Sequence, residues 1–170
     1  RMYSLINDIL EISKINVESH FREVNLNLVV YEVIQNLAPE TRSKADILVQ
    51  SSLPVIEADR TQMLQLFQNL ISNAIKYNKS EKARVEITCK NHRGAHEISI
   101  EDNGIGIPAE YREKVFVIFQ RLHSRNEFSG TGIGLAICKK IIDNMNGKIW
   151  VEKSALGGSA FKFIVPHKIE

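Results

Sequence analysis

The first residues of the chain repeat apolar side chains at helical spacing. Leu5, Ile9 and Ile12 follow Met2 at intervals of three or four residues, which predicts an amphipathic helix with an apolar seam running to Asn16. The seam is more apolar than a short surface helix requires. It fits a partner helix or packing against the core of the same protein, and the pattern leaves both interpretations open.

Beyond this helix, strand and helix patterns mix without strict β-α alternation. Helices are predicted over 28–44, 60–77, a short stretch after Pro108, and 131–145. Strands are predicted over 21–25, 47–50, 55–57, 84–90, 97–101, 148–152 and 160–165. The strands around the turn 91–94 form an antiparallel hairpin. The pattern is typical of an α+β two-layer sandwich, in which helices cover one face of a mixed sheet.

Two helix ends carry capping signals. Asp59 is a predicted N-cap, and Gln62 three residues later completes a capping-box pattern. Asn146 and Gly147 are predicted to end the last helix. The helix after Asp59 is expected to bury an apolar face made of Met63, Leu66, Leu70 and Ile71.

Composition narrows the class of protein. A chain of 170 residues with 44% hydrophobic and 25% charged residues fits one soluble domain with a core. The net charge of +2 gives no support for nucleic-acid binding. No apolar run approaches the roughly 20 residues of a membrane span, and Cys89 and Cys138 lack metal-site spacing. We expect reduced thiols, a cytoplasmic location without direct membrane contact, and a chain that is a fragment of a longer protein.

A first candidate site follows the strand 97–101. In Asp102-Asn103-Gly104-Ile105-Gly106, glycines permit unusual dihedrals and let the backbone approach a ligand closely. A carboxylate fixed at a strand end accepts well from an amino group such as that of adenine. The alternative is an ordinary turn that ends the strand, with Asp102 bonding its own backbone.

A second candidate is the glycine-rich entry to the last helix. Gly130, Gly132 and Gly134 lead directly into it, where free N–H groups and the helix dipole favour phosphate. The alternative is a capped turn. A P-loop is excluded because no GxxxxGK[ST] occurs. The GxGxxA match at 104–109 lies mid-chain beside a hairpin, which argues against a dinucleotide-binding fold.

A third candidate lies on the helix 60–77. Asn69, Asn73 and Lys76 share one face of it. Amide oxygens can bind Mg²⁺ together with phosphate oxygens and water, and a lysine offsets phosphate charge. The alternative is a polar face of a half-buried helix, although two asparagines in mid-helix cost propensity and so favour function.

In this order, the three motifs resemble the GHKL ATPase superfamily, and within it the histidine kinases of two-component systems. The resemblance covers 21–166. The matching segments are the N box (69–77), G1 box (101–108), F box (115–123), G2 box (130–141) and a closing glycine motif with its strand (157–166). Residues 1–19 resemble the end of the second dimerisation helix and its linker, and 20–168 the catalytic domain. Residues 119–141 also resemble phytochrome-like and PAS-linked sensors.

The resemblance implies a Bergerat ATP-binding fold and a role for each matching residue. Asn73 would bind Mg²⁺ with help from Asn69, Lys76 would approach phosphate, Tyr77 would line or stack on adenine, and Asp102 would accept from adenine N6. Further nucleotide-binding residues expected from the match are Gly104, Gly106, Ile107, Phe119, Gly130, Thr131, Gly132, Gly134, Leu135 and Ser159.

The resemblance also implies a lid over the site at 120–129. Phe116 and Phe119 would anchor it, and Arg121 would point at the γ-phosphate. Asn73, Lys76 and Arg121 are therefore the expected catalytic residues. Two departures stand out. Leu156 replaces an expected glycine, and no histidine has the context of the family's phosphorylated residue.

The implied function is to present the γ-phosphate of ATP, with Mg²⁺, to a histidine of the parent protein's own dimerisation domain. The parent would be a homodimer that relays the phosphoryl group to a response-regulator aspartate. Two alternatives remain: a nucleotide-sensing module without transfer, and an ATP hydrolase of the same superfamily. Hydrolysing relatives carry a glutamate where this chain has Asn69, which is a poor general base.

Overall fold

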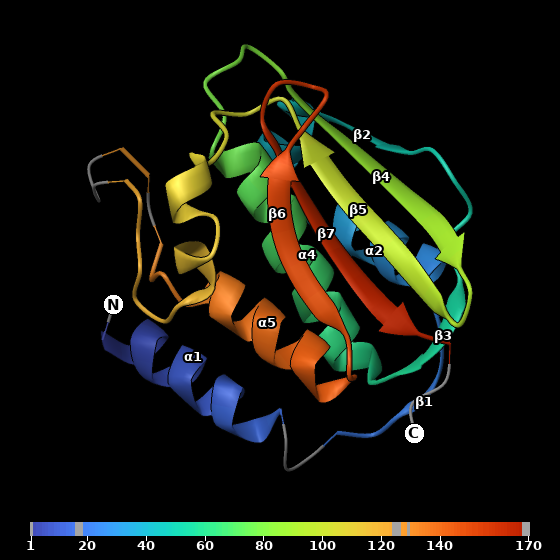
Figure 1. The fold of residues 1–170 in the computed structure, drawn as a ribbon. Coiled ribbons are helices and arrows are strands. Elements are labelled where there is room, and N and C mark those ends of the chain that lie inside the picture. Colours follow the sequence, from blue (N-terminus) through green and yellow to red (C-terminus); the bar gives the residue numbers. More distant parts are fainter. Residues whose placement is uncertain (1, 16–18, 124–126, 129, 168–170) are drawn as a thin grey trace.

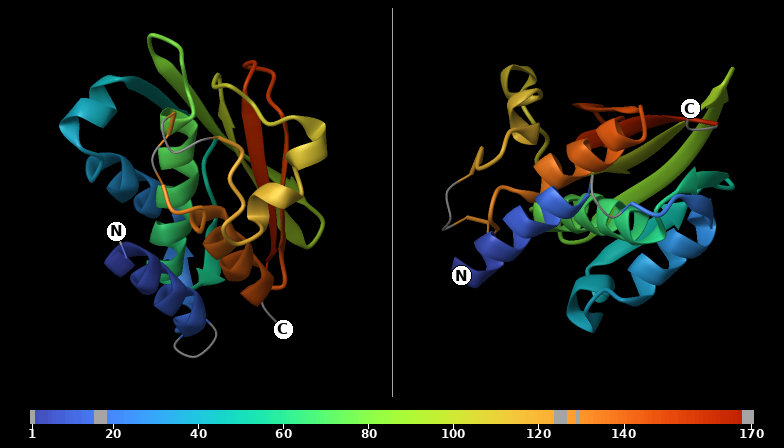
Figure 2. Two further views of the ribbon diagram at one scale, coloured as in Figure 1. Left: turned by 90° about the vertical axis from the view of Figure 1, so that its left-hand side faces the viewer. Right: turned by 90° about the horizontal axis from the view of Figure 1, so that it is seen from below.

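The structure, a computed structural model, describes residues 2–15, 19–123, 127–128 and 130–167. Its helices lie behind one face of a sheet (Figures 1 and 2). The α-helices are α1 (Met2–Lys14), α2 (Leu26–Gln35), α3 (Pro39–Ser43), α4 (Arg60–Lys76) and α5 (Gly134–Asn144). The strands are β1 (Arg22–Asn25), β2 (Ala45–Val49), β3 (Val55–Ala58), β4 (Ala83–His92), β5 (Ala95–Asp102), β6 (Lys148–Lys153) and β7 (Ser159–Pro166).

The main sheet has five strands in the order β2-β4-β5-β7-β6. β2 pairs with β4 in parallel, and the other neighbours are antiparallel. β1 and β3 form a separate antiparallel pair that the sequence did not predict as such. The mixed sheet and the α+β sandwich are confirmed, and so is the hairpin between β4 and β5.

The core lies between the sheet and helices α2, α4 and α5. The predicted apolar face of α4, Met63 to Ile71, is buried. Phe67 of the same helix meets Phe163 of β7 edge to face, with ring centroids 5.8 Å apart. On the sheet, Val85 and Ile98 lie on the inward side, as their alternation predicted. α4 is thereby fixed against the sheet, with its carboxyl end beside the end of β5.

Three helix predictions need correction. The predicted helix 28–44 is two helices, because Pro39 disfavours helical backbone in the residue before it and begins α3 as its first residue. The helix predicted from Thr131 begins at Gly134, because Gly130 and Gly132 take positive φ angles of 138° and 78°. After Pro108, only two short 3₁₀ turns form, η1 (Ala109–Tyr111) and η2 (Lys114–Phe116).

The end of α5 matches its prediction. Asn146 is left-handed, with φ 57°. The N–H of Asn146 donates to Asp143 O and that of Gly147 to Ile142 O, each at 3.0 Å. This is the hydrogen-bond pattern of a Schellman motif.

Asp59 caps α4 as predicted, and it does more. Its Oδ1 accepts from Gln62 N at 3.1 Å and its Oδ2 from His20 N at 2.8 Å. The reciprocal half of the predicted capping box is absent from the described residues: Gln62 Oε1, which would accept from the Asp59 N–H, has no hydrogen-bond partner, and Gln62 Nε2 donates to Ile15 O and Ser19 Oγ. Asp59 thus joins the start of α4 to the chain that enters β1.

We expect Asp59→Ala to lower the free energy of unfolding by about 1–2 kcal/mol, because it removes a helix cap and a second, partly buried hydrogen bond. Urea denaturation measures the loss. Asp46→Ala is the matched control, since its exposed ion pair with Lys82 contributes less than about 1 kcal/mol. Equal losses in the two variants would contradict the capping role.

The apolar seam of α1 is divided between two environments. Leu5, Ile12 and Ile15 pack against the core, whereas Met2 and Ile9 are exposed. Packing against the core is confirmed for part of the seam, and a partner helix for the exposed part stays a prediction. Among the described helices, none is long and apolar enough to cross a membrane.

Candidate functional site

A cavity of about 300 Å³ opens between α4, the end of β5, the segment after η2 and the start of α5. This volume is at the lower end of the range for ligand pockets, about 300–1,000 Å³. Its lining includes these residues predicted from the sequence: Asn69, Asn73, Lys76, Tyr77, Asp102, Gly106, Ile107, Arg121, Gly130, Thr131, Gly132, Gly134, Leu135 and Ser159. The three motifs thus meet around one space.

Two predicted residues do not line the cavity. Gly104 lies behind it, with its N–H donating to Asp102 Oδ1 at 2.8 Å. Phe119 is 56% exposed. Its N–H donates to Gly132 O at 3.0 Å, and its φ is 64°, so the backbone here does not direct the ring into the site. Lining residues that sequence reasoning missed are Ser72, Ile105, Val115, Gln120, Leu122, His123 and Phe161.

Asp102 is the buried acid of the cavity, with 4% of its surface exposed. Its Oδ1 accepts from the N–H groups of Gly104 and Ser159, at 2.8 and 3.0 Å. Burial raises the pKa of Asp102, and these two hydrogen bonds partly oppose the rise. Its Oδ2 has no hydrogen-bond partner among the described residues, so this oxygen can accept from a ligand.

The turn between β6 and β7 holds Asp102 from behind. Gly158 N donates to Asp102 O at 3.1 Å, and a Cβ at Gly158 would collide with Asp102 Oδ1 and Gly104 N. The positive φ of the turn, 105°, falls on Gly157. Leu156 stands where the resemblance expects a glycine. The structure needs glycine instead at 157, for its backbone angle, and at 158, for close packing.

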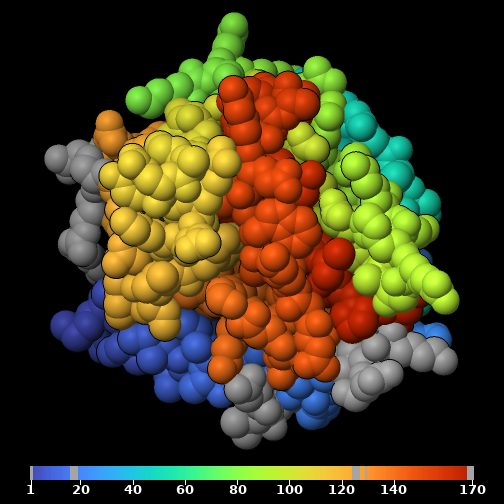
Figure 3. Space-filling view, in the orientation of Figure 1, coloured from blue at the N-terminus to red at the C-terminus, as the bar shows by residue number. Residues whose placement is uncertain are grey.

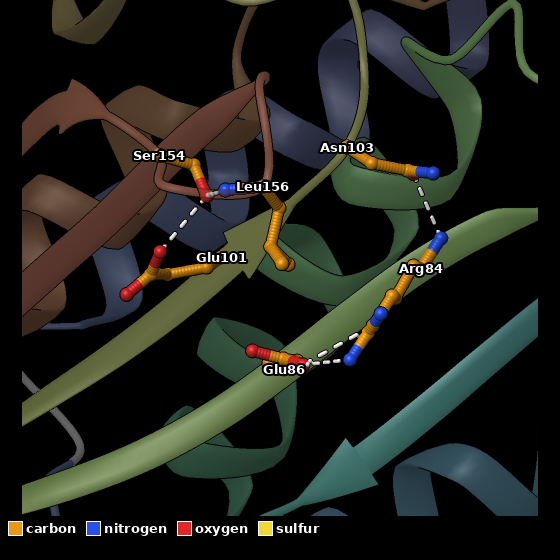
Figure 4. A network of polar contacts seen from close by, with 6 residues as sticks. All are labelled: Arg84, Glu86, Glu101, Asn103, Ser154 and Leu156. Atoms are coloured by element: carbon orange, nitrogen blue, oxygen red, sulfur yellow. Dashed lines mark hydrogen bonds and ion pairs between the residues drawn. The ribbon is translucent and has the colours of Figure 1, made fainter.

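The same turn is fixed by a polar network on the far side of Asp102 (Figure 4). Ser154 Oγ donates to Glu101 Oε2 at 2.8 Å and accepts from Leu156 N at 3.0 Å. Asn103 Oδ1 accepts from Arg84 N at 2.8 Å, which ties the next residue of the loop to β4. The strand end that carries Asp102 is therefore held on both sides.

The opposite side of the cavity is cationic and rich in backbone N–H groups. Lys76 Nζ lies 4.8 Å from the centre of the Tyr77 ring and close to Gly130, where a Cβ would come within 2.6 Å of it. The amino end of α5 begins at Gly134, and its unpaired N–H groups favour an anion. Phosphate fits this side by charge and by backbone geometry.

The two asparagines of α4 differ in what they contact. Asn69 Nδ2 donates to Gly134 O at 3.3 Å, which joins α4 to the start of α5. The side-chain amide of Asn73 makes no hydrogen bond with the described residues, and Asn73 lines the cavity. Within the described part of the chain, no group of three His, Cys, Asp or Glu side chains could hold a metal ion. Mg²⁺ would fit as an ion held by amide oxygens, phosphate oxygens and water.

An aromatic group closes one side. The ring centroids of Tyr77, His123 and Phe128 lie 5.0 to 6.0 Å apart in pairs. Of the two rings beside Tyr77, that of His123 lines the cavity and that of Phe128 does not. His123 lies within the predicted lid, but the sequence assigned it no role of its own, because this polar, aperiodic stretch carries no local signal for a single residue.

The predicted lid is only partly visible, since 124–126 and 129 lie outside the described residues. Arg121 lines the cavity, but its guanidinium donates to the carbonyls of Gly130 (2.9 Å) and Phe128 (2.5 Å). The Phe116 ring packs edge to face on the Phe161 ring, with centroids 6.2 Å apart, and anchors this segment, which lies beside β6 on the surface of the molecule (Figure 3). The described part of the lid is thus fastened by the rings of Phe116 and Phe161, by the Arg121 guanidinium and by the backbone of Phe119, which donates to Gly132 O.

Residues 58–169 match the sequence profile of the family described as Histidine kinase-, DNA gyrase B-, and HSP90-like ATPase. The chain belongs to this family. It is 40% identical over 166 residues to cyanobacterial phytochrome A from Nostoc sp. (strain PCC 7120 / SAG 25.82 / UTEX 2576), which covers 97% of this chain and 22% of that protein. The chain thus spans about a fifth of the length of that relative.

Solved histidine kinases share the fold of this ATPase-family chain. The catalytic domain of histidine kinase ThkA is 34% identical, with a TM-score of 0.75, covering 88% of this chain and 97% of that one. Full-length ShkA, solved with AMPPNP, is 28% identical, with a TM-score of 0.81, covering 99% and 36%. ThkA in complex with the response regulator TrrA is 30% identical, with a TM-score of 0.74, covering 98% and 48%. The chain matches the ATP-binding catalytic domains of histidine kinases in family and in fold, and the predicted family and fold are confirmed.

Proposed function

We propose that this chain binds ATP with Mg²⁺ and presents the γ-phosphate to a histidine on the dimerisation domain of its parent protein. The phosphoryl group would then pass to an aspartate of a response-regulator receiver domain. The cavity is the observation that best supports this proposal. Asp102 Oδ2, which has no hydrogen-bond partner among the described residues, lies on one side of it, and the glycine-rich amino end of α5 lies on the other. Residues 1–19 would end the dimerisation helix and linker, and 20–168 would form the catalytic domain.

Each proposed role follows from a contact in the cavity. Asp102 Oδ2 accepts from adenine N6 while Oδ1 stays bonded to the backbone. Tyr77 lines the base. Lys76 and the N–H groups at the start of α5 neutralise phosphate charge. Asn73, with Asn69, would hold Mg²⁺, which offsets the charge that develops on the phosphate oxygens.

The transfer needs a nucleophile from outside this domain. An imidazole nitrogen attacks the γ-phosphorus, the bond from that phosphorus to the β,γ-bridging oxygen breaks, and ADP leaves with the electron pair. The imidazole loses its N–H proton. The domain's contribution is positioning and charge neutralisation, as is usual for phosphoryl transfer.

The same geometry does not favour hydrolysis. Asn69 occupies the position of the glutamate that activates water in hydrolysing relatives, and an amide is a poor general base. Its Nδ2 is also engaged with Gly134 O. We therefore expect slow ATP turnover by this chain alone.

Calorimetric titration with ADP, ATP and GTP, with and without Mg²⁺, tests the binding step. We expect adenine-selective, Mg²⁺-sensitive binding. Absence of binding by the folded protein would overturn the proposal. Transfer is then tested with a supplied dimerisation domain and labelled ATP. Binding without transfer would instead favour a nucleotide-sensing module.

We expect Arg121→Ala to slow phosphoryl transfer and to leave the affinity for ADP largely unchanged. Arg121 has five N–H donors in all, and two of its guanidinium nitrogens are bonded to loop carbonyls. The remaining donors can meet a γ-phosphate, which ADP lacks. Transfer rate and ADP affinity, measured side by side, check this. An equal loss of ADP and ATP affinity would show that Arg121 serves the loop alone.

A further inference from the structure

Helix α1 reaches the rim of the cavity. It lies beside α5 (Figures 1 and 2). Thr131 Oγ1 donates to Asp8 Oδ2 at 2.8 Å, across 123 positions of sequence. Thr131 also lines the cavity, between glycines 130 and 132. One hydrogen bond therefore links the proposed end of the dimerisation domain to the loop proposed to hold phosphate.

The contact belongs to a helix that is held on the domain by one of its sides and by the residue that follows it, Ile15. Ile15 is buried, with 3% exposed. Its carbonyl accepts from the side-chain amides of Gln62 and Asn144, at 3.2 and 3.3 Å. One turn after Asp8, Glu11 Oε2 accepts from Gln65 Nε2 at 2.6 Å. These contacts hold the helix on α4 and α5, so the position of Asp8 is set by the docked helix.

Two features of this contact disfavour the binding of a ligand with several phosphates. A threonine hydroxyl has a single hydrogen, and Thr131 donates it to Asp8 rather than to a phosphate oxygen. In the part of the chain that is described, no lysine or arginine forms an ion pair with Asp8. Asp8 contacts Thr131, which itself lines the cavity. The negative charge of Asp8 therefore lies within about 10 Å of the cavity, which is the screening length at 0.1 M salt.

We propose that Asp8 determines how the site discriminates between nucleotides by their number of phosphates. With α1 docked, ATP binding is weakened more than ADP binding, and AMP binding is little affected. This inference rests on the proposed nucleotide binding. By linkage, ATP must loosen the docking of α1 by the same factor. A movement of α1 and the occupancy of the site are therefore coupled.

Asp8→Ala tests the proposal by removing both the charge and the acceptor, and alanine suits a helix. We expect its ATP affinity to rise about fivefold, the lower end of typical coupling between sites. ADP affinity should rise less and AMP affinity should hold. Asp8→Asn, which keeps an acceptor oxygen, should show an intermediate rise. Glu11→Ala is the matched control: it removes the same charge from α1 and loosens the same docking, but its partner Gln65 does not line the cavity, so ATP affinity should rise less than in Asp8→Ala.

Hydrogen exchange supplies a readout that a merely structural effect would not move. Saturating ATP should speed exchange of α1 amides in the wild-type protein, and AMP should not. An unchanged ATP-to-AMP affinity ratio in Asp8→Ala, an equal rise in Glu11→Ala, or α1 exchange unaffected by ATP would each overturn the inference. If the wild-type protein binds none of these nucleotides, the proposed function fails as well. If it binds them and Asp8→Ala changes nothing, only this inference fails.

Discussion

Asp102→Asn should weaken binding of adenine nucleotides by about 1.5–3 kcal/mol, the scale of a hydrogen bond to a charged group. The amide can keep its oxygen on the N–H groups of Gly104 and Ser159, which Asp102 Oδ1 now holds. Its NH₂ would then replace Oδ2 and face the amino group of adenine. Two donors would meet, so the backbone support survives and the recognition contact is lost. Calorimetric titration with ADP measures the change.

The control is the neighbouring substitution Glu101→Gln. Glu101 accepts from Ser154 on the far side of the strand, and it does not line the cavity. It should therefore leave ADP affinity nearly unchanged. GTP serves as a second control, because guanine carries a carbonyl where adenine has its amino group, and the variant should lose less GTP affinity than ADP affinity. Unchanged ADP affinity in a folded Asp102→Asn protein would contradict the assignment of Asp102 as the acceptor for the adenine amino group.

The acid also gives the site a pH dependence. Burial raises the pKa of Asp102 above the usual aspartate range. Its carboxylate accepts from adenine only when ionised, so ADP affinity should fall as the pH is lowered through that raised pKa. The Asp102→Asn variant lacks the titrating group and provides the reference curve.

Local sequence rules predicted the parts of this structure that depend on near neighbours. Asp59 and Gln62 lie three residues apart, so the cap of α4 was readable. The β4–β5 hairpin followed from alternation around one turn. The predicted helix 28–44 shows why one signal is not enough. Its apolar period suggested a continuous helix, but Pro39 disfavours helical backbone in the residue before it. The residues that meet in the cavity were found because their motifs share an order with a known family.

Contacts between distant segments could not be read in this way. Asp8 and Thr131 have no local pattern that pairs them, and their meeting depends on how α1 docks. Arg121 was assigned to phosphate from its motif, but carbonyls of its own loop hold two of its guanidinium nitrogens. His123 lines the cavity with its ring beside those of Tyr77 and Phe128, two residues far from each other in the sequence. Such placements follow from tertiary packing, which overrides local preference.

The closing glycine motif gives the second large prediction. Gly158→Ala should lower ADP affinity at least as much as Asp102→Asn, by about 1.5–3 kcal/mol or more. A Cβ at Gly158 would overlap Asp102 Oδ1 and Gly104 N. Both are fixed backbone or buried groups that cannot turn aside like the end of a flexible side chain. The carboxylate must move, and the acceptor for adenine moves with it. ADP titration of the folded variant measures the loss.

Gly157→Ala is the matched control, one residue away in the same turn. Its added Cβ meets nothing within 4 Å, but its φ of 105° strains any residue other than glycine. Strain of this kind costs about 1–3 kcal/mol of stability. We therefore expect Gly157→Ala to unfold at lower urea concentration and still bind ADP, whereas Gly158→Ala loses ADP binding even where it remains folded. The reverse result would mean that the turn acts on the site through its backbone angle, and that the close packing of Gly158 on Asp102 does not set the position of the acid.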